Sequence, residues 1–311
     1  MHSNSSAPSR SISGRTLRRS AERGSLLREP TRGASTMTAF LACRQHFDRV
    51  GSTNDVVRGW LANDTPEVCL AVAAEQTNGR GRAGRRWVAP PGGALLLSLG
   101  FRPHWLPPAD VWRLAAVVSL TMAEAGEAVA GLSVGTIRLK WPNDLVIESM
   151  PAIDSPAVIR KLAGVLGETD GLGTASPRAV VGIGINTDWA AEAFLPELAR
   201  SMTSLRVAAD GRPVDDAALL EAFIDRLEPR VDALRSDGAF DAETWSERQV
   251  TTDREIRLDR PDGPITVRAT GVDPASGALL VVDPGAPGRS RSVFVGEVSH
   301  VRFADPTMVG V

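Results

Sequence analysis

Cysteine is scarce in this 311-residue sequence, which holds only Cys43 and Cys69, neither in a CxxC motif nor in a histidine-rich setting. That scarcity argues against a disulfide framework and a structural zinc site, and it favours a reducing, cytoplasmic compartment. Long apolar runs are missing as well. The best candidate, 111–132, is interrupted by Arg113, Glu124 and Glu127, so it falls short of the roughly 18 uninterrupted apolar residues that a membrane-spanning helix needs. We therefore expect no membrane span.

Lysine is almost absent from the chain. Of the 35 basic residues, 33 are arginine, and only Lys140 and Lys161 are lysine. A bias of the genome toward arginine explains most of this imbalance, but it does not explain the two exceptions. A compact ammonium fits among ligand oxygens where a planar guanidinium does not, so each surviving lysine is a candidate functional group.

The overall composition, with 43% hydrophobic and 23% charged residues, is typical of a globular chain with one large core and a smaller domain. Charge is distributed unevenly along it. Residues 1–36 hold nine serines, seven arginines, two glutamates and no aromatic residue, which predicts a disordered tail. The rest of the chain holds 28 basic and 35 acidic residues, and this acidic body argues against a general nucleic-acid surface.

Other interpretations of this tail stay open. Met37 is a candidate for the true start, because the periodic sequence begins just after it. The arginine-rich, acid-poor composition is also similar to that of an organellar transit peptide. A DNA-binding regulator that acts through the tail is a rival function of a different class. The chain shows no helical reading head for that role, and the acidic body would oppose binding.

From Phe40 onward, segments typical of strands alternate with amphipathic helical ones. Strands are predicted at 68–74, 94–101, 137–141, 162–168 and 179–185. Helices are predicted to begin at Ser52 or Thr53 and at Asp110, and a long one covers 219–234 with Gly238 as its stop. After about Val250, turn signals every ten residues or so predict a small all-β barrel. The expected units are therefore a tail (1–36), an α/β catalytic body (37–249), a barrel (250–304) and a short tail (305–311).

The densest signal for chemistry is the segment 76–87, with the sequence QTNGRGRAGRRW. Gly79, Gly81 and Gly84 satisfy the GxGxxG pattern, but another strand follows instead of the helix that a dinucleotide fingerprint must open. The segment is better interpreted as a glycine-rich loop whose arginines bind phosphate or carboxylate, with Trp87 stacking on a base or covering the pocket. The alternative is a solvated basic loop with a core tryptophan.

Three later motifs add candidates. KWPND (140–144) ends a strand and presents Asn143 and Asp144 beside Lys140, which suits a phosphate site in which Asp144 holds Mg²⁺ or a ribose hydroxyl. KLAGVLGE (161–168) places Lys161 at the start of a strand, next to small residues that allow close approach of a ligand. GIGINT (182–187) is a strand whose glycines leave room on one face. Each motif alone is equally compatible with an ordinary turn or sheet.

Taken in order, these motifs resemble those of the biotin protein ligases. The resemblance starts at Ser52-Thr53-Asn54, continues through the four motifs above and reaches GEVSHVR at 296–302. It implies an α+β fold in which a mixed sheet flanked by helices, like that of class II synthetases and lipoate ligases, is followed by an SH3-like barrel. It also implies the function: biotin and ATP form biotinyl-5′-AMP, and biotin is then transferred to a lysine of a biotin carboxyl carrier protein domain.

The resemblance further implies which residues bind the substrates. Lys161, Arg82 and Lys140 are the expected catalytic cations. The residues expected to face biotin are Ser52, Thr53, Asn54, Gln76, Gly79, Arg80, Gly81, Arg82, Lys161 and Gly164. Those expected to face ATP or the adenylate are Arg82, Arg85, Trp87, Lys140, Asn143, Asp144 and Asn186, with Asp144 as the Mg²⁺ ligand.

The sequence departs from the common pattern of that family in two places. Sixteen residues separate Asp144 from Lys161, which predicts a longer hairpin loop over 145–160. Residues 1–50 are too few and too polar for the winged-helix domain of the bifunctional members. The nearest rival function is ligation of lipoate or octanoate on the same fold. The oligomeric state stays open, since the resemblance is compatible with a monomer and with a homodimer joined through sheet edges.

Overall fold

The computed structural model of the protein describes residues 40–149, 157–283, 285 and 288–304. The predicted tails at 1–36 and 305–311 and the proposed start at Met37 lie outside these residues, as does the middle of the predicted insertion at 145–160. No helix in the described part of the chain is long and apolar enough to cross a bilayer.

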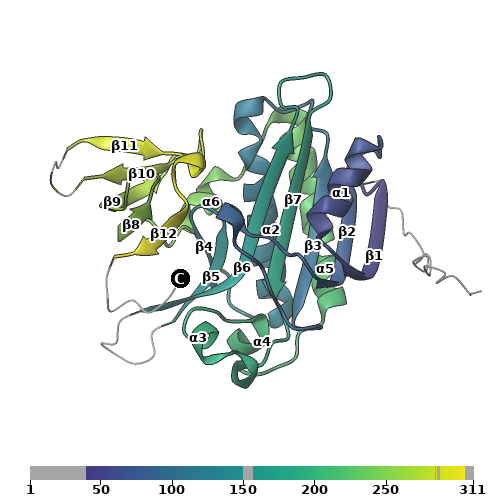
Figure 1. Ribbon diagram of the computed structural model, residues 1–311, viewed down its shortest axis with the longest axis horizontal. Coiled ribbons are helices and arrows are strands. Elements are labelled where there is room, and N and C mark those ends of the chain that lie inside the picture. Colours follow the sequence, from purple (N-terminus) through teal and green to yellow (C-terminus); the bar gives the residue numbers. More distant parts are fainter. Residues whose placement is uncertain (1–39, 150–156, 284, 286–287, 305–311) are drawn as a thin grey trace, which may run out of the picture. The chain divides into compact units, whose positions relative to one another are not determined.

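A seven-stranded mixed sheet forms the larger part of the fold, with strand order β1-β2-β3-β7-β6-β5-β4 (Figure 1). Its strands are β1 (Cys43–Val50), β2 (Cys69–Gln76), β3 (Ala94–Phe101), β4 (Ile137–Lys140), β5 (Asp144–Ser149), β6 (Val158–Asp170) and β7 (Arg178–Asn186). Strands β1 and β2 run parallel, and the other neighbouring pairs run antiparallel. The prediction of a mixed sheet is therefore confirmed.

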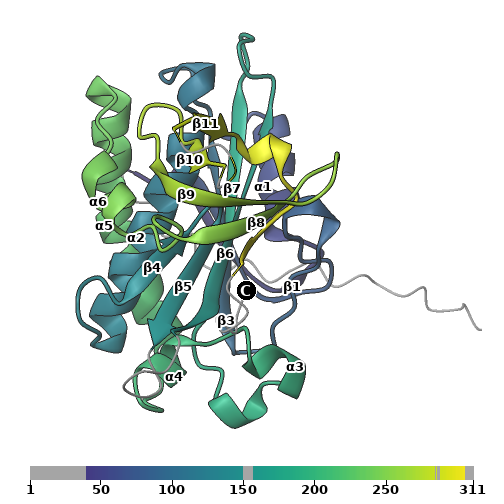
Figure 2. The same cartoon turned by 90° about the vertical axis from the view of Figure 1, so that its left-hand side faces the viewer.

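Helices cover both faces of this sheet. Helix α1 (Thr53–Ala62) lies on one face, while α2 (Trp112–Ala130) and α5 (Asp216–Asp237) lie on the other (Figures 1 and 2). Short helices follow β7 and α5: α3 (Pro196–Ala199), α4 (Leu205–Ala208) and α6 (Ala242–Glu247). Successive side chains of a strand point to opposite faces. The sheet can therefore pack its core against α2 and α5 and still present a separate surface beside α1.

The amphipathic stripes of the sequence account for the main helices. In α5 the buried residues are the seven of the predicted stripe, namely Leu219, Leu220, Phe223, Ile224, Leu227, Val231 and Leu234. Gly238 ends this helix in the left-handed conformation, with φ of 73°, as a stop signal should. The helix predicted at Ser52 or Thr53 begins at Thr53, with Ser52 in the N-cap position.

Two predicted element starts are wrong. Lys161 does not start a strand: β6 begins at Val158, because β5 pairs with it from Ser149 onward and the ladder extends past the lysine. Asp110 does not begin a helix either. It ends a short 3-10 turn that starts at Pro108, and α2 begins at Trp112. Proline favours the first position of such a turn but cannot donate a backbone hydrogen bond within it.

The C-terminal residues form a second sheet of five antiparallel strands, ordered β11-β10-β9-β8-β12. These are β8 (Glu255–Asp259), β9 (Ile265–Val272), β10 (Leu279–Val282), β11 (Ser290–Val293) and β12 (His300–Phe303). The sheet is consistent with the predicted SH3-like barrel. The unit boundary at 249/250 stays a prediction. Residues on both sides of it contact β4: Leu139 exchanges backbone hydrogen bonds of 2.8 Å with Arg248 and Val250.

One ion pair is buried where α2, β4 and the end of α6 meet. The Glu127 carboxylate accepts hydrogen bonds from Arg248 Nη1 at 2.7 Å and Nη2 at 3.0 Å, and from the backbone N–H of Ile137 at 2.8 Å. The two side chains are only 3% and 7% exposed. Removing one partner would leave the other charge buried without compensation.

We predict that Glu127→Ala lowers the free energy of unfolding by about 3–5 kcal/mol, because Arg248 would stay buried without its counter-ion. Urea denaturation at neutral pH measures the loss. Asp232→Ala is the matched control. Asp232 pairs with Arg235 at the surface and is 56% exposed, so its loss should change stability by less than about 1 kcal/mol. Equal effects of the two substitutions would contradict the prediction.

Candidate active site

Glycines line the face of β6 and β7 that lies toward α1. Gly164 of β6 pairs with Gly184 of β7. Gly182 precedes Gly184 by two residues on β7, so it lies on the same face of the sheet. The indole of Trp87 lies on this glycine floor. A Cβ at Gly184 would come within 2.7 Å of its ring atoms, and one at Gly164 within 3.3 Å. Only residues without a side chain allow an aromatic ring to approach the sheet this closely.

A cavity of about 440 Å³ opens over this floor. Its walls are the start of α1, the glycine-rich loop after β2 and the segment that contains α3. Most of the predicted site residues line it: Ser52, Thr53, Asn54, Gln76, Arg80, Gly81, Arg82, Arg85, Trp87, Asn143, Lys161 and Gly164. Residues from four separate stretches of the sequence thus converge on one cavity.

The remaining predicted residues lie nearby. Lys140 and Asp144 line a neighbouring cavity of about 680 Å³, which shares Arg82 and Asn143 with the first. Gly79 and Asn186 line neither of the two. The carbonyl of Gly79 accepts the backbone N–H of Trp87 at 3.0 Å, which holds the loop closed on itself. Asn186 is fully buried and donates from Nδ2 to Thr203 O at 2.9 Å, while its Oδ1 has no partner among the described residues.

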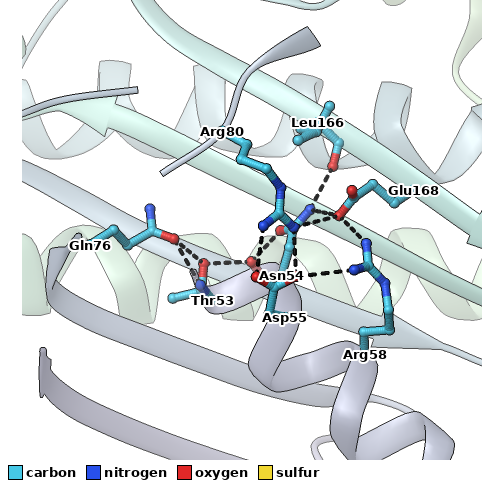
Figure 3. Close-up of polar contacts among 9 residues, drawn as sticks. Thr53, Asn54, Asp55, Arg58, Gln76, Arg80, Leu166 and Glu168 are labelled. Carbon is cyan, nitrogen blue, oxygen red and sulfur yellow. Dashed lines mark hydrogen bonds and ion pairs between the residues drawn. The ribbon is translucent and has the colours of Figure 1, made fainter. Parts of the chain in front are cut away.

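At the α1 end of the cavity, buried and half-buried polar side chains form a connected chain (Figure 3). Gln76 Oε1 accepts from the Thr53 backbone N–H at 2.7 Å and from the Thr53 hydroxyl at 3.1 Å. The Ser98 hydroxyl lies 2.6 Å from both Thr53 Oγ1 and Asn54 Oδ1. Because Oε1 of Gln76 is already used, its amide N–H groups are the donors that this end can offer to a ligand.

Charged groups gather at the opposite end of the cavity, where β5 and β6 meet. Lys161 Nζ lies 2.5 Å from Asp144 Oδ1 and 5.6 Å from the centroid of the Trp87 ring. Burial alone would raise the pKa of Asp144, but Lys161 and Lys140 outweigh it and hold this pKa below its usual value. The carboxylate is therefore ionised at neutral pH, and it fixes the Lys161 ammonium at the cavity wall.

Lys140 is more deeply buried than Lys161 and is only 3% exposed. Its Nζ donates to Val301 O of β12 at 2.7 Å. Burial lowers its pKa to about 8, although the nearby Asp144 opposes that shift. Both lysines of the chain therefore lie near one carboxylate, that of Asp144.

The glycine-rich loop is bound to the second sheet by two arginines. Arg82 Nη2 donates to Val295 O at 2.8 Å and to Val298 O at 2.9 Å. Arg85 Nη1 lies 2.9 Å from His300 Nδ1. Burial, together with Lys140 and Arg85, lowers the pKa of His300 to about 4, so the imidazole is neutral at neutral pH and Nδ1 can accept from Arg85.

A third arginine of the loop is bound elsewhere. Arg80 was expected to face biotin; it lines the cavity, and both of its terminal nitrogens donate to Asp55 at 2.6 Å. Sequence reasoning assigned no role to Asp55 or Ser98, because neither lies in a quoted motif. Glu168 and His300 lay inside quoted motifs and were also given no role. Only the packing of α1, β3, β6 and β12 around the loop brings these side chains into contact with it.

A divalent cation would find few protein ligands here. No group of three or more histidine, cysteine, aspartate or glutamate side chains in the described ranges could hold a metal ion. Asp144 is a buried carboxylate at this end, and one of its oxygens already accepts from Lys161. A cation such as Mg²⁺ would have to take most of its oxygen ligands from water and from a bound phosphate.

Comparison of the chain with known proteins shows which family it resembles. The model of the biotin/lipoate A/B protein ligase family matches residues 46–186. The chain is 30% identical over 256 residues to the biotin–[acetyl-CoA-carboxylase] ligase of Mycobacterium tuberculosis, covering 82% of this chain and 87% of that protein. It is 27% identical over 239 residues to the bifunctional ligase/repressor BirA of Bacillus spizizenii, covering 76% and 69% of the two chains.

The chain therefore belongs to the biotin protein ligases. A solved biotin protein ligase from Aquifex aeolicus, in complex with biotin and ATP, superposes with a TM-score of 0.66 at 24% identity. The match covers 84% of this chain and 99% of that one. At this identity the superposition shows the fold, and it confirms the fold class predicted from the motifs.

We predict that Gly184→Ala moves Trp87 off the glycine floor, because the new Cβ would lie 2.7 Å from two atoms of the indole. A shift in tryptophan emission reports the movement. The shift should vanish when both proteins also carry Trp87→Phe. Gly167→Ala on β6 is the control, since its Cβ would meet nothing closer than Ala115 at 3.9 Å. A similar shift in the control, or one that survives Trp87→Phe, would contradict the prediction.

Proposed function

We propose that the chain is an ATP-dependent biotin protein ligase. In the first step a biotin carboxylate oxygen attacks the α-phosphorus of ATP, which forms biotinyl-5′-AMP and releases pyrophosphate. In the second step a lysine amine of a biotin carboxyl carrier protein domain attacks the acyl carbon, which forms an amide and releases AMP. The observation that carries the proposal is the convergence of most motif residues of one ligase family on a single cavity with a polar end and a cationic end.

The polar end suits the ureido head of biotin. There, Thr53, Ser52, Asn54 and Gln76 supply hydroxyl and amide groups, and Gln76 has N–H donors to spare. The apolar arm would then run over the glycine floor at Gly164, with Gly79, Arg80 and Gly81 in the loop above. A cavity that is mostly apolar with a few fixed polar groups is the usual form of a small-molecule site.

The cationic end suits the phosphates. Positioning and charge stabilisation supply most of the rate in such a transfer, because negative charge gathers on the oxygens around the α-phosphorus. Lys161 would donate to the reacting carboxylate and to the α-phosphate. Trp87, Asn143 and Asn186 would hold the nucleoside, and Asp144 would hold Mg²⁺, which neutralises triphosphate charge when bound.

Arg82, Arg85 and Lys140 would act once the second sheet releases or redirects them. In the structure Arg82 and Lys140 donate to backbone carbonyls of the 295–301 segment, and Arg85 contacts His300 there. A phosphate is a stronger acceptor for a guanidinium than a neutral carbonyl is, because the hydrogen bond is then charge-assisted at both ends. Binding of ATP would therefore compete for these groups and close the loop over the substrate.

The partner assignments are part of the same proposal. The acceptor is a carrier domain of acetyl-CoA carboxylase or a related carboxylase, the compartment is the cytoplasm, and no nucleic acid or membrane takes part. Pairing of two copies through sheet edges, as the family resemblance allows, is a separate hypothesis that sedimentation of the purified chain would test.

Biotin-dependent exchange of pyrophosphate into ATP tests the first step, and transfer of labelled biotin to a carrier domain from the same cell tests the second. Lipoate and octanoate, offered in place of biotin, test the rival acids. Exchange that depends on biotin alone supports the proposal. Exchange with lipoate but not with biotin would show that the chain is a lipoate ligase and would overturn the proposal.

We predict that Lys161→Arg lowers adenylation by at least about 10²-fold, or roughly 2.7 kcal/mol of transition-state stabilisation. A guanidinium is wider than an ammonium and cannot converge on two oxygens of different groups without displacing one. Pyrophosphate exchange measures the loss, and thermal unfolding should be unchanged because Arg can keep the ion pair with Asp144. A variant that keeps more than a third of the parent's rate would exclude Lys161 as the catalytic cation and would point to Lys140.

We predict that adenylation falls as the pH rises through about 8, because Lys140 then loses its proton and its charge. The Lys140→Met variant should be slower but flat between pH 7 and about 9. The titration of Lys140 does not itself destabilise the fold in this range. A lysine whose folded pKa lies below its unfolded value of 10.5 contributes stability that increases as the pH rises from 8 toward 10.5. An equally flat profile for the parent would contradict the prediction.

A further inference from the structure

Four charged side chains form a cluster beside the cavity. One of them, Arg80, was assigned above to the biotin site, and the other three have no assigned role. Asp55 and Arg58 come from the first turns of α1, Glu168 from β6, and Arg80 from the glycine-rich loop (Figure 3). We call this group the α1–β6 ion cluster. It holds two acids and two bases, so its charge is balanced within itself.

The contacts in the cluster are short and specific. Arg80 binds Asp55 through both terminal nitrogens at 2.6 Å, in the bidentate arrangement that guanidinium and carboxylate favour. Arg58 donates to Asp55 at 3.0 Å and lies 2.7 Å from Glu168 Oε2. The hydrogen bond from Arg80 lowers the pKa of Asp55, so this carboxylate is ionised at neutral pH.

Through Glu168 the cluster reaches the polar end of the cavity. Glu168 Oε2 accepts from Asn54 Nδ2 at 2.7 Å, so the Asn54 amide must turn its Oδ1 the other way. That oxygen lies 2.6 Å from the Ser98 hydroxyl, which in turn lies 2.6 Å from Thr53 Oγ1. The orientation of the polar chain that ends at Gln76 therefore depends on a carboxylate that does not line the 440 Å³ cavity.

Through Asp55 the cluster holds the loop. Among the described residues, Arg80 is the one side chain of 79–87 that forms an ion pair; Arg82 and Arg85 bind backbone carbonyls or His300 instead. The side chains of the cluster are 27–46% exposed. Salt and water weaken ion pairs at such exposure, so this is a contact that can open without unfolding the domain.

We propose that Asp55 and Glu168 are positioning residues of the ligation. Asp55 anchors Arg80, and with it the start of the glycine-rich loop, over the proposed biotin site. Glu168 fixes the amide of Asn54 at the polar end of the cavity. Neither carboxylate takes part in bond making. The proposal rests on the function proposed above, in that it assigns to both residues the retention of biotin and of its adenylate.

The expected result for Asp55→Asn is a split between binding and chemistry. KM for biotin should rise about tenfold while kcat for pyrophosphate exchange stays within about twofold, because the start of the loop at Arg80 is released while Arg82 and Arg85 keep their contacts with the 295–300 segment. Asp55→Glu should restore most of the affinity. Glu168→Ala should also raise KM, since it removes the acceptor of the Asn54 amide. Glu168→Gln should restore most of the affinity, because an amide oxygen can still accept from Asn54.

Asp170→Asn is the matched control. Asp170 lies on β6, two residues beyond Glu168, and forms its own ion pair with Arg178, but it does not contact the cavity. It should leave KM and kcat unchanged. A KM for Asp55→Asn that matches the Asp170→Asn control would overturn the role of Asp55, and a Glu168→Ala variant that matches it would overturn the role of Glu168.

A second measurement does not depend on activity. The loop carries Arg80, Arg82, Arg85 and Arg86, each a site for trypsin, so brief digestion followed by mass spectrometry reports cleavage within 80–86. Asp55→Asn should speed this cleavage about tenfold in 0.1 M salt, and 1 M salt should speed it in the parent but not in the variant. Cleavage at the parental rate in Asp55→Asn would overturn the anchoring role.

The two measurements separate the proposals. A parent chain with no biotin-dependent exchange would overturn the proposed function, whatever trypsin shows. An active parent whose Asp55→Asn variant keeps both its KM and its resistance to trypsin would overturn the positioning role alone. The exchanged pair Asp55→Arg with Arg80→Asp completes the test: it should recover resistance to trypsin that Arg80→Asp alone has lost, if the ion pair itself anchors the loop.

Discussion

The close approach of side chains to the backbone of β6 and β7 is the constraint on which the rest of the site depends. Gly164 and Gly184 face each other across the two strands, and the indole of Trp87 occupies the space that two Cβ atoms would fill. This contact brings the glycine-rich loop down onto the sheet. Once the loop is there, its arginines can reach α1 on one side and the second sheet on the other.

The two ends of the cavity differ in electrostatics for reasons that lie in the sheet. At the α1 end, neutral hydroxyls and amides satisfy one another, and the nearby ion cluster is balanced in charge. At the other end, one buried carboxylate, Asp144, faces two lysines, so positive charge is left over. An acid with a polar head and an anionic reacting group would be oriented by this difference before any chemistry begins.

The second sheet and the segment before its last strand contact the site directly. Its 295–301 segment accepts hydrogen bonds from Arg82 and Lys140 and contacts Arg85, which are three of the cations that the proposed function assigns to the phosphates. A conformational change that exchanges carbonyl partners for phosphate oxygens would leave the number of hydrogen bonds nearly constant. Such an exchange keeps the charged groups satisfied in both states, which lowers the free-energy cost of moving between them.

The sequence by itself determined where the periodic elements lie and in which order the motifs come. It also singled out the two lysines among 33 arginines as candidate functional groups, because these signals are local or compositional. Periodicity predicted the long helix, while the resemblance of the motifs to those of the biotin protein ligases implied the mixed sheet and most residues that line the cavity. Tertiary structure alone decided which charges meet. Arg80 pairs with Asp55, 25 residues away, and Asn54 pairs with Glu168, 114 residues away. Such contacts depend on strand order and register, which fix distances between distant segments and leave no periodic trace in the chain.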